Sequence, residues 1–538
     1  MAHARRAAYR RPGPPLYAVA MEPFTIALCQ VRAREIDEAE ENLQAILAAL
    51  DRAGDAGAQL VALPECAYPA YYLRGAHAYE RPEVRPYDEV CRLLGEKAHR
   101  YGYWLAAGLA VPHPEGRLSN SGVVFGPDGE IRGQYDKQFL WHFDNNWFEP
   151  GREFPVWDAG FCRFGILICA DSRQPEIARS LYVNGAELIV DLTAWVSTGR
   201  TVQELTTTQC QYLMPARAYE NGVWVAACDK WGSEDGTIVY AGRSSVIDPL
   251  GQTLVCAPSD ADEVVVYTID PQDAAPPVPR RPALYSMLTM PQDELPILSL
   301  MREPMVPADE DRRVAVVPGD GAAFDAGTVV ARYEALRAQD VDFMVFAGVT
   351  GPEGWQVDLP PIETAVRGGG GSLLLGVASD GCAPSQSAVL VTPDRTVEHL
   401  ASHGRGINTG ETLSPVIETP AGNVGILCGD EGLVPEVARC LMLQGADILA
   451  WTLFEADPMA EVLGRARSDE NKVYTAAAWP DGGVIAEPSG GPMVHVPAGT
   501  GVAMAAQVNR AVARWKDRAP GTNMVRDRIP GAYGALVR

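Results

Sequence analysis

The chain has 538 residues, and its 69 acidic and 45 basic side chains give it a formal net charge of −24 at pH 7. This acidity argues against a nucleic acid or an anionic membrane surface as partner, because both would repel the protein. Apolar residues make up 47% of the chain and charged residues 21%, which is typical of a globular protein. The eleven cysteines include no C-x-x-C pair, which favours a reducing compartment, the cytoplasm, over a disulfide framework or a zinc site.

The chain is long enough for two domains of about 250 residues each. Residues 1–22 predict a disordered basic tail, because positions 1–20 hold four arginines, three prolines and no acid. There is no apolar stretch typical of a secretory signal, and Met21 is an alternative start just before the first predicted strand. Residues 301–311 predict a linker between domains at 23–300 and 312–538.

In chain order, the first domain alternates apolar runs with amphipathic segments. This alternation, with the helices occurring in two pairs, predicts a layered α/β domain built around sheets. The predicted strands are 24–29, 59–63, 104–109, 121–125, 130–135, 165–168, 187–190 and 223–228, and the predicted helices are 37–53, 87–101, a helix from Pro175, and 202–219.

The same pattern then restarts. GILICADSRQPEIARSLYVNG at 165–185 is matched by GILCGDEGLVPEVARCLMLQG at 425–445, and ARAYENGVWVAAC at 216–228 by ARSDENKVYTAAA at 466–478. Near the C-terminus, RIPGAY repeats the RRPALY of 280–285. A period near 250 residues indicates an internal duplication in which each repeat is a whole domain.

A cysteine stands at the centre of the first repeated stretch. Cys169 follows the short apolar strand and precedes the helix that opens at Pro175-Glu176. A cysteine on a sharp strand-to-helix turn can present its sulfur to a pocket. Taken alone, it could equally be a small core residue.

Three separated motifs resemble those of the nitrilase, or carbon–nitrogen hydrolase, superfamily: LVALPE ending in Glu65, GQYDK ending in Lys137, and GILICAD containing Cys169. The resemblance covers about 23–300, and more weakly 312–538. It implies two α-β-β-α sandwich domains packed as an intramolecular pseudo-dimer, with further homo-oligomers an open alternative. It also implies a Glu-Lys-Cys triad that needs neither a metal nor an organic cofactor.

The resemblance assigns a role to each member of the triad. Cys169 would attack a carbonyl carbon, Glu65 would act as base and then acid, and Lys137 would stabilise the oxyanion. The family has a second Glu in the loop after the lysine. Here the nearest acid is Asp144, which is one methylene shorter, so its contact with Lys137 is left open.

Other residues near the triad are candidates for substrate binding. Arg173 matches an arginine that N-carbamoyl-amino-acid hydrolases and ω-amidases use near a substrate carboxylate, and a structural ion pair is its equal alternative. The aromatic residues Trp141, His142, Trp147 and Trp195 either line the pocket or serve as packing.

The second repeat lacks the triad. Counting from Pro435-Glu436 places Gly429 opposite Cys169, and Cys428 at a buried-strand position that points to the other face. The base position is predicted at Gly348 and the lysine position at His403. The second domain is therefore predicted to be a degenerate half that supplies an interface.

The sequence thus predicts a hydrolase of a small amide or N-carbamoyl compound that works through a cysteine thioester and releases ammonia. A nitrilase acting on a nitrile is the first alternative, although Ala170-Asp171 replaces the Trp-Glu that follows the cysteine of true nitrilases. A non-catalytic binding or scaffold protein is the second, and it leaves the complete triad unexplained.

Overall fold

The computed structural model describes residues 22–114, 116–274, 276–301, 311–319, 325–351, 357–379, 384–407 and 409–538. The predicted tail and linker therefore lie almost entirely outside the described residues. Among the helices of the described ranges, none is both long and apolar enough to cross a membrane.

The first half of the chain contains two six-stranded sheets. The first sheet has the order β15-β1-β2-β3-β4-β5 and the second β14-β13-β10-β8-β7-β6. The strands of the first sheet are β1 Phe24–Gln30, β2 Leu60–Ala62, β3 Trp104–Pro112, β4 Leu118–Phe125, β5 Ile131–Asp136 and β15 Glu263–Ile269. Those of the second are β6 Val156–Asp158, β7 Arg163–Ile168, β8 Leu188–Leu192, β10 Trp224–Cys228, β13 Ser245–Ile247 and β14 Thr253–Cys256.

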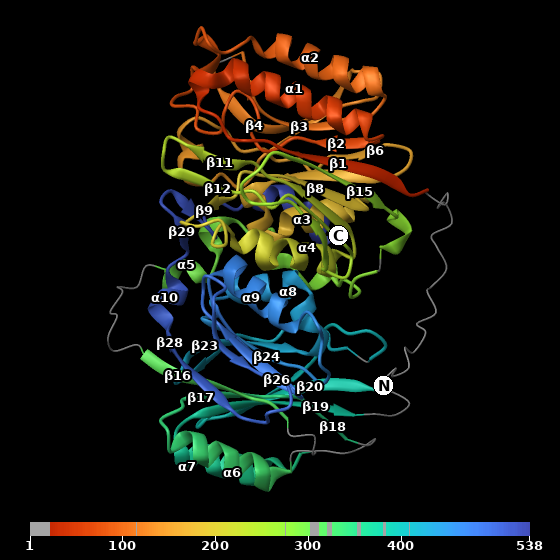
Figure 1. Cartoon of the computed structure of the whole chain (residues 1–538). Helices are drawn as coiled ribbons and strands as arrows, with labels where there is room; N and C mark the ends of the chain where they lie inside the picture. The colour runs from red at the N-terminus through yellow and green to blue at the C-terminus, as the bar shows by residue number, and fades with distance from the viewer. Residues whose placement is uncertain are drawn as a thin grey trace.

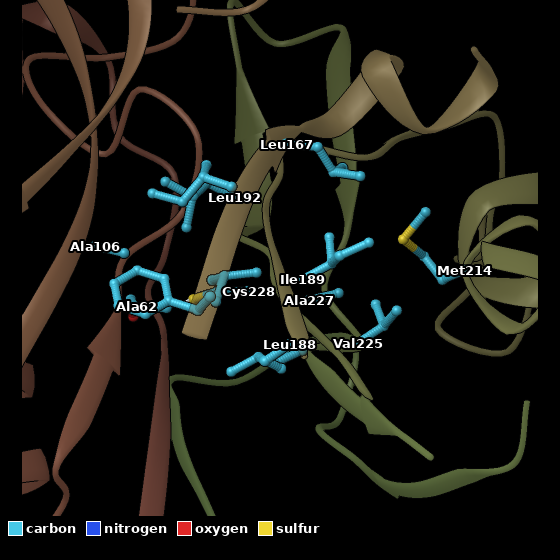
Figure 2. Packing of buried hydrophobic residues seen from close by; sticks show 14 of the residues in the cluster. Ala62, Ala106, Leu167, Leu188, Ile189, Leu192, Met214, Val225, Ala227 and Cys228 are labelled. Atoms are coloured by element: carbon cyan, nitrogen blue, oxygen red, sulfur yellow. Dashed lines mark hydrogen bonds between the residues drawn. The ribbon is translucent and has the colours of Figure 1, made fainter. Parts of the chain in front are cut away.

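The two sheets pack face to face, with helices on both outer sides. Helices α1 (Ala39–Asp55) and α2 (Tyr87–Tyr101) lie against the first sheet, while α3 (Pro175–Val183) and α4 (Met214–Asn221) cover the second. Alternate side chains of the second sheet serve both interfaces: Figure 2 shows Leu192 and Cys228 on the side of Ala62 and Ala106, and Ile189 and Val225 on the side of Met214. This α-β-β-α arrangement is the predicted fold.

One predicted helix begins later than expected. The pattern over 202–219 predicted one helix, but a π-helical turn begins only at Gln209 and leads into α4. Both backbone polar groups of Thr206 are bound by the Ser197 hydroxyl, which donates to the carbonyl at 3.0 Å and accepts from the N–H at 3.2 Å. These contacts hold the preceding segment in a non-helical conformation.

The second half repeats the arrangement. One sheet has the order β21-β20-β19-β17-β16-β28, with β18 beside β19, and the other β22-β23-β24-β25-β26-β27. The strands are β16 Asp311–Val317, β17 Phe343–Phe346, β18 Val349–Gly351, β19 Ser372–Ser379, β20 Ser385–Val391, β21 Thr396–Leu400, β22 Ile417–Thr419, β23 Gly422–Cys428, β24 Ile448–Thr452, β25 Tyr474–Trp479, β26 Gly482–Ala486, β27 Pro492–Val496 and β28 Met504–Asn509. The helices beside these sheets are α6 Ala326–Arg337, α7 Leu359–Gly369, α8 Pro435–Leu443 and α9 Ala460–Asn471, and the short α10 Arg510–Arg514 follows β28.

The halves meet through the helices next to their second sheets. Figure 1 shows α3 and α4 of the first half above α8 and α9 of the second, with α1 and α2 at one end of the molecule and α6 and α7 at the other. One apolar cluster includes Leu213 and Ala216 from the first half and Val437, Leu441 and Leu463 from the second.

Buried ion pairs cross this contact with approximate twofold symmetry. Glu176 lies 3.1 Å from Arg439 and 3.0 Å from Arg528. Its counterpart Glu436 lies 3.2 Å from Arg179 and 2.8 Å from Arg280. Because Arg280 and Arg528 belong to the repeated RRPALY and RIPGAY segments, the end of each half reaches the helix of the other.

A second buried cluster joins α4 to α9. Arg217 pairs with both Glu220 and Glu470, and Arg467 lies 2.8 Å from each of the same two carboxylates. All four side chains are fully buried. Burial by itself would lower the pKa of both guanidinium groups, but the carboxylates outweigh it and raise the pKa of each.

Candidate active site

Cys169 sits at the sharp turn between β7 and α3. Its φ of +48° lies in the left-handed region that a non-glycine residue seldom adopts, and strain of this kind is concentrated at functional sites. Its N–H donates to Asp191 Oδ1 at 2.8 Å, and Asp171 Oδ2 accepts the N–H of Ile168 at 3.0 Å. Two buried carboxylates thus fix the two successive peptide N–H groups that lead into the thiol.

Glu65, Lys137 and Asp144 converge beside this turn. Lys137 Nζ lies 2.6 Å from Glu65 Oε1 and 2.6 Å from Asp144 Oδ2, and all three side chains are fully buried. Glu65 follows β2, Lys137 follows β5, and Asp144 belongs to a 3₁₀ turn at His142–Asn146. The shorter Asp therefore reaches the lysine, which answers the question that the sequence left open.

The charges of the site depend on one another. Burial raises the pKa of the Cys169 thiol, the Glu65 carboxylate raises it further, and Lys137 opposes both. For Lys137, burial would lower the pKa, but Asp144 and Glu65 together raise it well above its usual value. Burial also raises the pKa of Glu65 despite the nearby ammonium, which is the direction expected for the acid and base role that the resemblance implies.

Several residues at the site were not predicted from the sequence. Asn120 in β4 donates from Nδ2 to Glu65 Oε1 at 2.7 Å, and Lys137 Nζ lies 5.6 Å from the centre of the Tyr71 ring. The sequence signal for Asp191 was a carboxylate inside the buried strand LIVDL. Asn120 carried no such signal, because only the pairing of β4 with its neighbouring strands brings it to the site.

Arg173 is buried and already has a carboxylate partner. Its Nη1 lies 3.0 Å from Asp469 Oδ2 in the second half, its Nη2 donates to Gln209 at 2.8 Å, and its guanidinium carbon lies 5.1 Å from the Trp141 ring centre. This is the ion-pair alternative that the sequence offered. Binding of a substrate carboxylate by Arg173 would require the pair with Asp469 to open.

The other aromatic candidates lie in different environments. His142 is exposed and Trp147 half-buried, and both rings pack against Phe143. Trp195 is completely buried in the core between the layers of the first half, and its backbone N–H donates to Asp229. Contact of these rings with a substrate stays a prediction.

The second half has the same backbone framework without these side chains. The N–H of Glu65 donates to Thr193 O and that of Gly348 to Leu453 O, which confirms Gly348 as the counterpart of Glu65. Gly429 has a φ of +55° at the turn after β23, which confirms it as the counterpart of Cys169.

The predicted lysine position was wrong by two residues. The N–H of Lys137 donates to Asn120 O in β4, and the matching bond in the second half runs from Ala401 N–H to Gln386 O in β20. Ala401, and not His403, therefore stands where Lys137 does. Counting from the turn failed because the first hairpin is longer: Phe125 pairs with Ile131 next to a β-bulge, whereas Val391 pairs with Thr396 without one. His403 instead stacks on Tyr285, whose hydroxyl lies 2.7 Å from its Nε2.

Side chains fill the space that the missing groups would occupy. A Cβ built on Gly429 would lie 2.0 Å from Gln386 Oε1, and one built on Gly348 would lie 2.4 Å from the Phe454 ring. Gln386 is the counterpart of Asn120, so the residue that contacts the base in one half blocks the nucleophile position in the other.

Comparison with known proteins agrees with this geometry. The carbon-nitrogen hydrolase family profile matches residues 25–276 and 385–514. The chain belongs to the carbon-nitrogen hydrolase family. Two separate matched regions are compatible with the duplication that the sequence and the fold display.

The individual relatives each correspond to about half of the chain. The omega-amidase NIT2 of Homo sapiens is 30% identical over 258 residues, which cover 46% of this chain and 88% of that protein. A nitrilase of Pyrococcus abyssi is 33% identical over 238 residues, covering 44% and 86%. Among solved structures, an amidase from Nesterenkonia sp. has 27% identity and a TM-score of 0.41, covering 48% of this chain and 94% of the amidase.

Proposed function

We propose that the first half of this carbon-nitrogen hydrolase cleaves a small amide or an N-carbamoyl compound through a thioester on Cys169 and releases ammonia. The observation that carries the proposal is the fully buried Lys137, held 2.6 Å from both Glu65 and Asp144 beside the strained Cys169 turn. A scaffold protein has no need to bury an ammonium between two carboxylates next to a thiol.

In the first step Cys169 Sγ attacks the carbonyl carbon of the substrate, and the thiol proton passes to Glu65. The carbonyl oxygen becomes an oxyanion, which the Lys137 ammonium stabilises. The carbon–nitrogen bond then breaks, Glu65 returns its proton to the departing nitrogen, and ammonia leaves. The product is an acyl thioester on Cys169.

In the second step a water molecule replaces the ammonia. Glu65 takes a proton from the water, the hydroxyl oxygen bonds to the thioester carbon, and the carbon–sulfur bond breaks. The proton returns to the sulfur and the acid product leaves. Asp144 takes no part in these proton transfers: its charge holds Lys137 and keeps the ammonium protonated.

We further propose that the second half is a non-catalytic partner and that the two halves form an intramolecular pseudo-dimer. The support is the symmetric pairing of Glu176 and Glu436 with arginines of the opposite half, together with the apolar cluster shared by both. Fusion raises the effective concentration of each face for the other. The second half could then lose its triad without losing the contact.

A nitrile is the second candidate substrate, because one relative carries the name nitrilase. The residues Ala170-Asp171 after the nucleophile disfavour it. The experiment is an ammonia-release screen of the full chain over small amides, N-carbamoyl amino acids and nitriles, with Cys169→Ala as the control. Release from amides or carbamoyl compounds that is absent in Cys169→Ala supports the proposal. Release from nitriles alone would favour the nitrilase, and release from none would favour a scaffold.

A further inference from the structure

A hairpin near the C-terminus of the chain enters the first half beside the active site. It consists of β29 (Asp517–Ala519) and β30 (Thr522–Asn523), joined through Gly521 at a φ of +74°. The family match ends at residue 514, so this hairpin lies beyond the matched region.

Thr522 contacts the loop that carries Asp144. Its buried hydroxyl accepts the N–H of His142 at 2.7 Å and lies 3.2 Å from the carbonyl oxygen of Leu140, to which it donates. One side chain thus holds the backbone on both sides of Trp141. His142 has a φ of +47°, a conformation that costs a non-glycine residue about 1 kcal/mol or more and so needs support from its surroundings.

The contact with Leu140 leads directly to the buried lysine. The carbonyl of Leu140 and the N–H of Trp141 belong to one planar peptide group and point in opposite directions. That N–H donates to Asp144 Oδ2 at 2.9 Å, and the same oxygen accepts from Lys137 Nζ at 2.6 Å. The Thr522 hydroxyl, the peptide, Asp144 and Lys137 therefore form one chain of hydrogen bonds, whose members polarise each other.

Little else in the described ranges orients the Asp144 carboxylate. Its Oδ1 is buried and has no hydrogen-bond partner there, so both of its side-chain contacts fall on Oδ2. If the peptide between Leu140 and Trp141 rotated, Asp144 would lose one of these two contacts. The direction of that peptide consequently matters for the position of the Lys137 ammonium.

The hairpin is well fixed where it makes this contact. Asn523 donates from its N–H to Asp527 and from its side chain to Asp517, each at 2.6 Å. Met524 is completely buried in the core of the first half, and Gln174 donates to its carbonyl at 3.4 Å. These anchors do not involve the Thr522 hydroxyl, so the hairpin can stay in place without it.

We infer that Thr522, contributed by the half without a triad, is a positioning residue for the catalytic half: it aims the Leu140–Trp141 peptide at Asp144 and thereby sets Lys137 against Glu65. The inference rests on the proposed function for its catalytic consequence. It gives the second half a role at the active site in addition to the interface.

The test compares Thr522→Val, which keeps the shape and removes the hydroxyl, with Thr522→Ser, which keeps the hydroxyl. The matched control is Thr475→Val, because Thr475 is equally buried in the second half and its hydroxyl has no hydrogen-bond partner within the described ranges. We expect Thr522→Val to lower kcat about tenfold with KM within about twofold. Thr522→Ser and Thr475→Val should stay within about threefold of the unaltered protein on both constants.

A second readout does not need a substrate. Alkylation of Cys169 by iodoacetamide can be followed on the Cys169 peptide by mass spectrometry. Its rate should fall about fivefold in Thr522→Val, because a displaced Lys137 alters the electrostatic environment of both Glu65 and the Cys169 thiol. The two controls should alkylate at the rate of the unaltered protein. If Thr522→Val does not fold, the pair Thr522→Ala and Thr522→Ser isolates the hydroxyl in the same way.

The outcomes separate the inference from the proposed function. Slower alkylation in Thr522→Val supports the positioning role even if no tested compound releases ammonia, in which case only the proposed function fails. If Thr522→Val matches Thr475→Val in both kcat and alkylation while ammonia is released normally, the positioning role is wrong and the proposed function stands.

Discussion

The two halves of this chain share one backbone framework and differ in the side chains at its equivalent positions. At the turn after the central strand one half has Cys169 at a φ of +48° and the other Gly429 at +55°. The same left-handed turn is therefore present in both halves, with a thiol in one and a glycine in the other. Backbone geometry at this point is a property of the fold, and the chemistry depends on which side chains are placed on it.

The two halves also differ in what occupies the space at the equivalent site. Where the first half has Asn120 bound to Glu65, the second has Gln386 in the space beside Gly429. Phe454 fills the space beside Gly348 in the same way. Protein interiors are close-packed, so at these two positions other side chains occupy the volume that a larger residue would need.

The largest expected effect is the loss of chemistry from one half only. Cys169→Ala, Glu65→Gln and Lys137→Ala should each lower kcat by about 10³-fold or more while the protein stays folded, because the triad acts as a unit. Cys428→Ala in the second half should leave kcat within about twofold, since that thiol is buried and points to the opposite face. Ammonia release measures kcat, and circular dichroism shows whether each variant is folded. Equal losses from Cys169→Ala and Cys428→Ala would mean that the halves are not functionally distinct.

A smaller effect is expected where the halves depend on each other. Burial would raise the pKa of Glu176, but Arg439 and Arg528 outweigh it and lower the pKa, so the carboxylate is ionised at neutral pH. Glu176→Gln leaves two buried arginines without their counter-ion and should lower the free energy of unfolding by about 3 kcal/mol in urea titrations.

Glu89→Gln is the control for this change, because Glu89 is only half-buried and pairs with Arg85 near the surface. It should cost no more than about 0.5 kcal/mol. If the two substitutions cost the same, the buried ion pairs between the halves do not stabilise the folded chain.

The smallest expected effect is on stability, at Gly429 in the second half. Gly429→Ala should lower the free energy of unfolding by about 1–3 kcal/mol, because the left-handed turn disfavours a Cβ and Gln386 Oε1 occupies its place. In Gly429→Ala/Gln386→Ala the steric part is relieved, so the double variant should be about 1 kcal/mol more stable than the sum of the single changes predicts. Simple additivity would show that Gln386 does not block this position.

That Glu65 and Lys137 lie beside the Cys169 turn could be anticipated from the sequence, because each of the three residues ends or follows a strand within a contiguous motif that resembles the family's. Gly348 and Gly429 could be placed by counting, because the strand-to-turn units around them have equal lengths in both halves. The lysine counterpart could not, because the hairpin before Ala401 has a different length, and the count arrived at His403.

The remaining site residues depend on contacts between distant segments. Asn120 lies 55 residues from Glu65 in the chain, and Thr522 lies 380 residues from His142. Arg173 itself could be singled out from the sequence, because it stands four residues after Cys169. Its partner Asp469 could not, because it is 296 residues away in the chain. A single sequence carries no signal for such pairs, because neither periodicity nor local spacing connects their members.

The central claim is that one half performs the chemistry and the other supports it. The most direct test is to incubate the full chain with an amide that releases ammonia, quench it in acid, and map the acyl adduct by peptide mass spectrometry. The account predicts at most one acyl group per chain, bound to Cys169 as a thioester. An adduct on Cys428 or on a residue other than Cys169, or turnover that continues in Cys169→Ala, would contradict it.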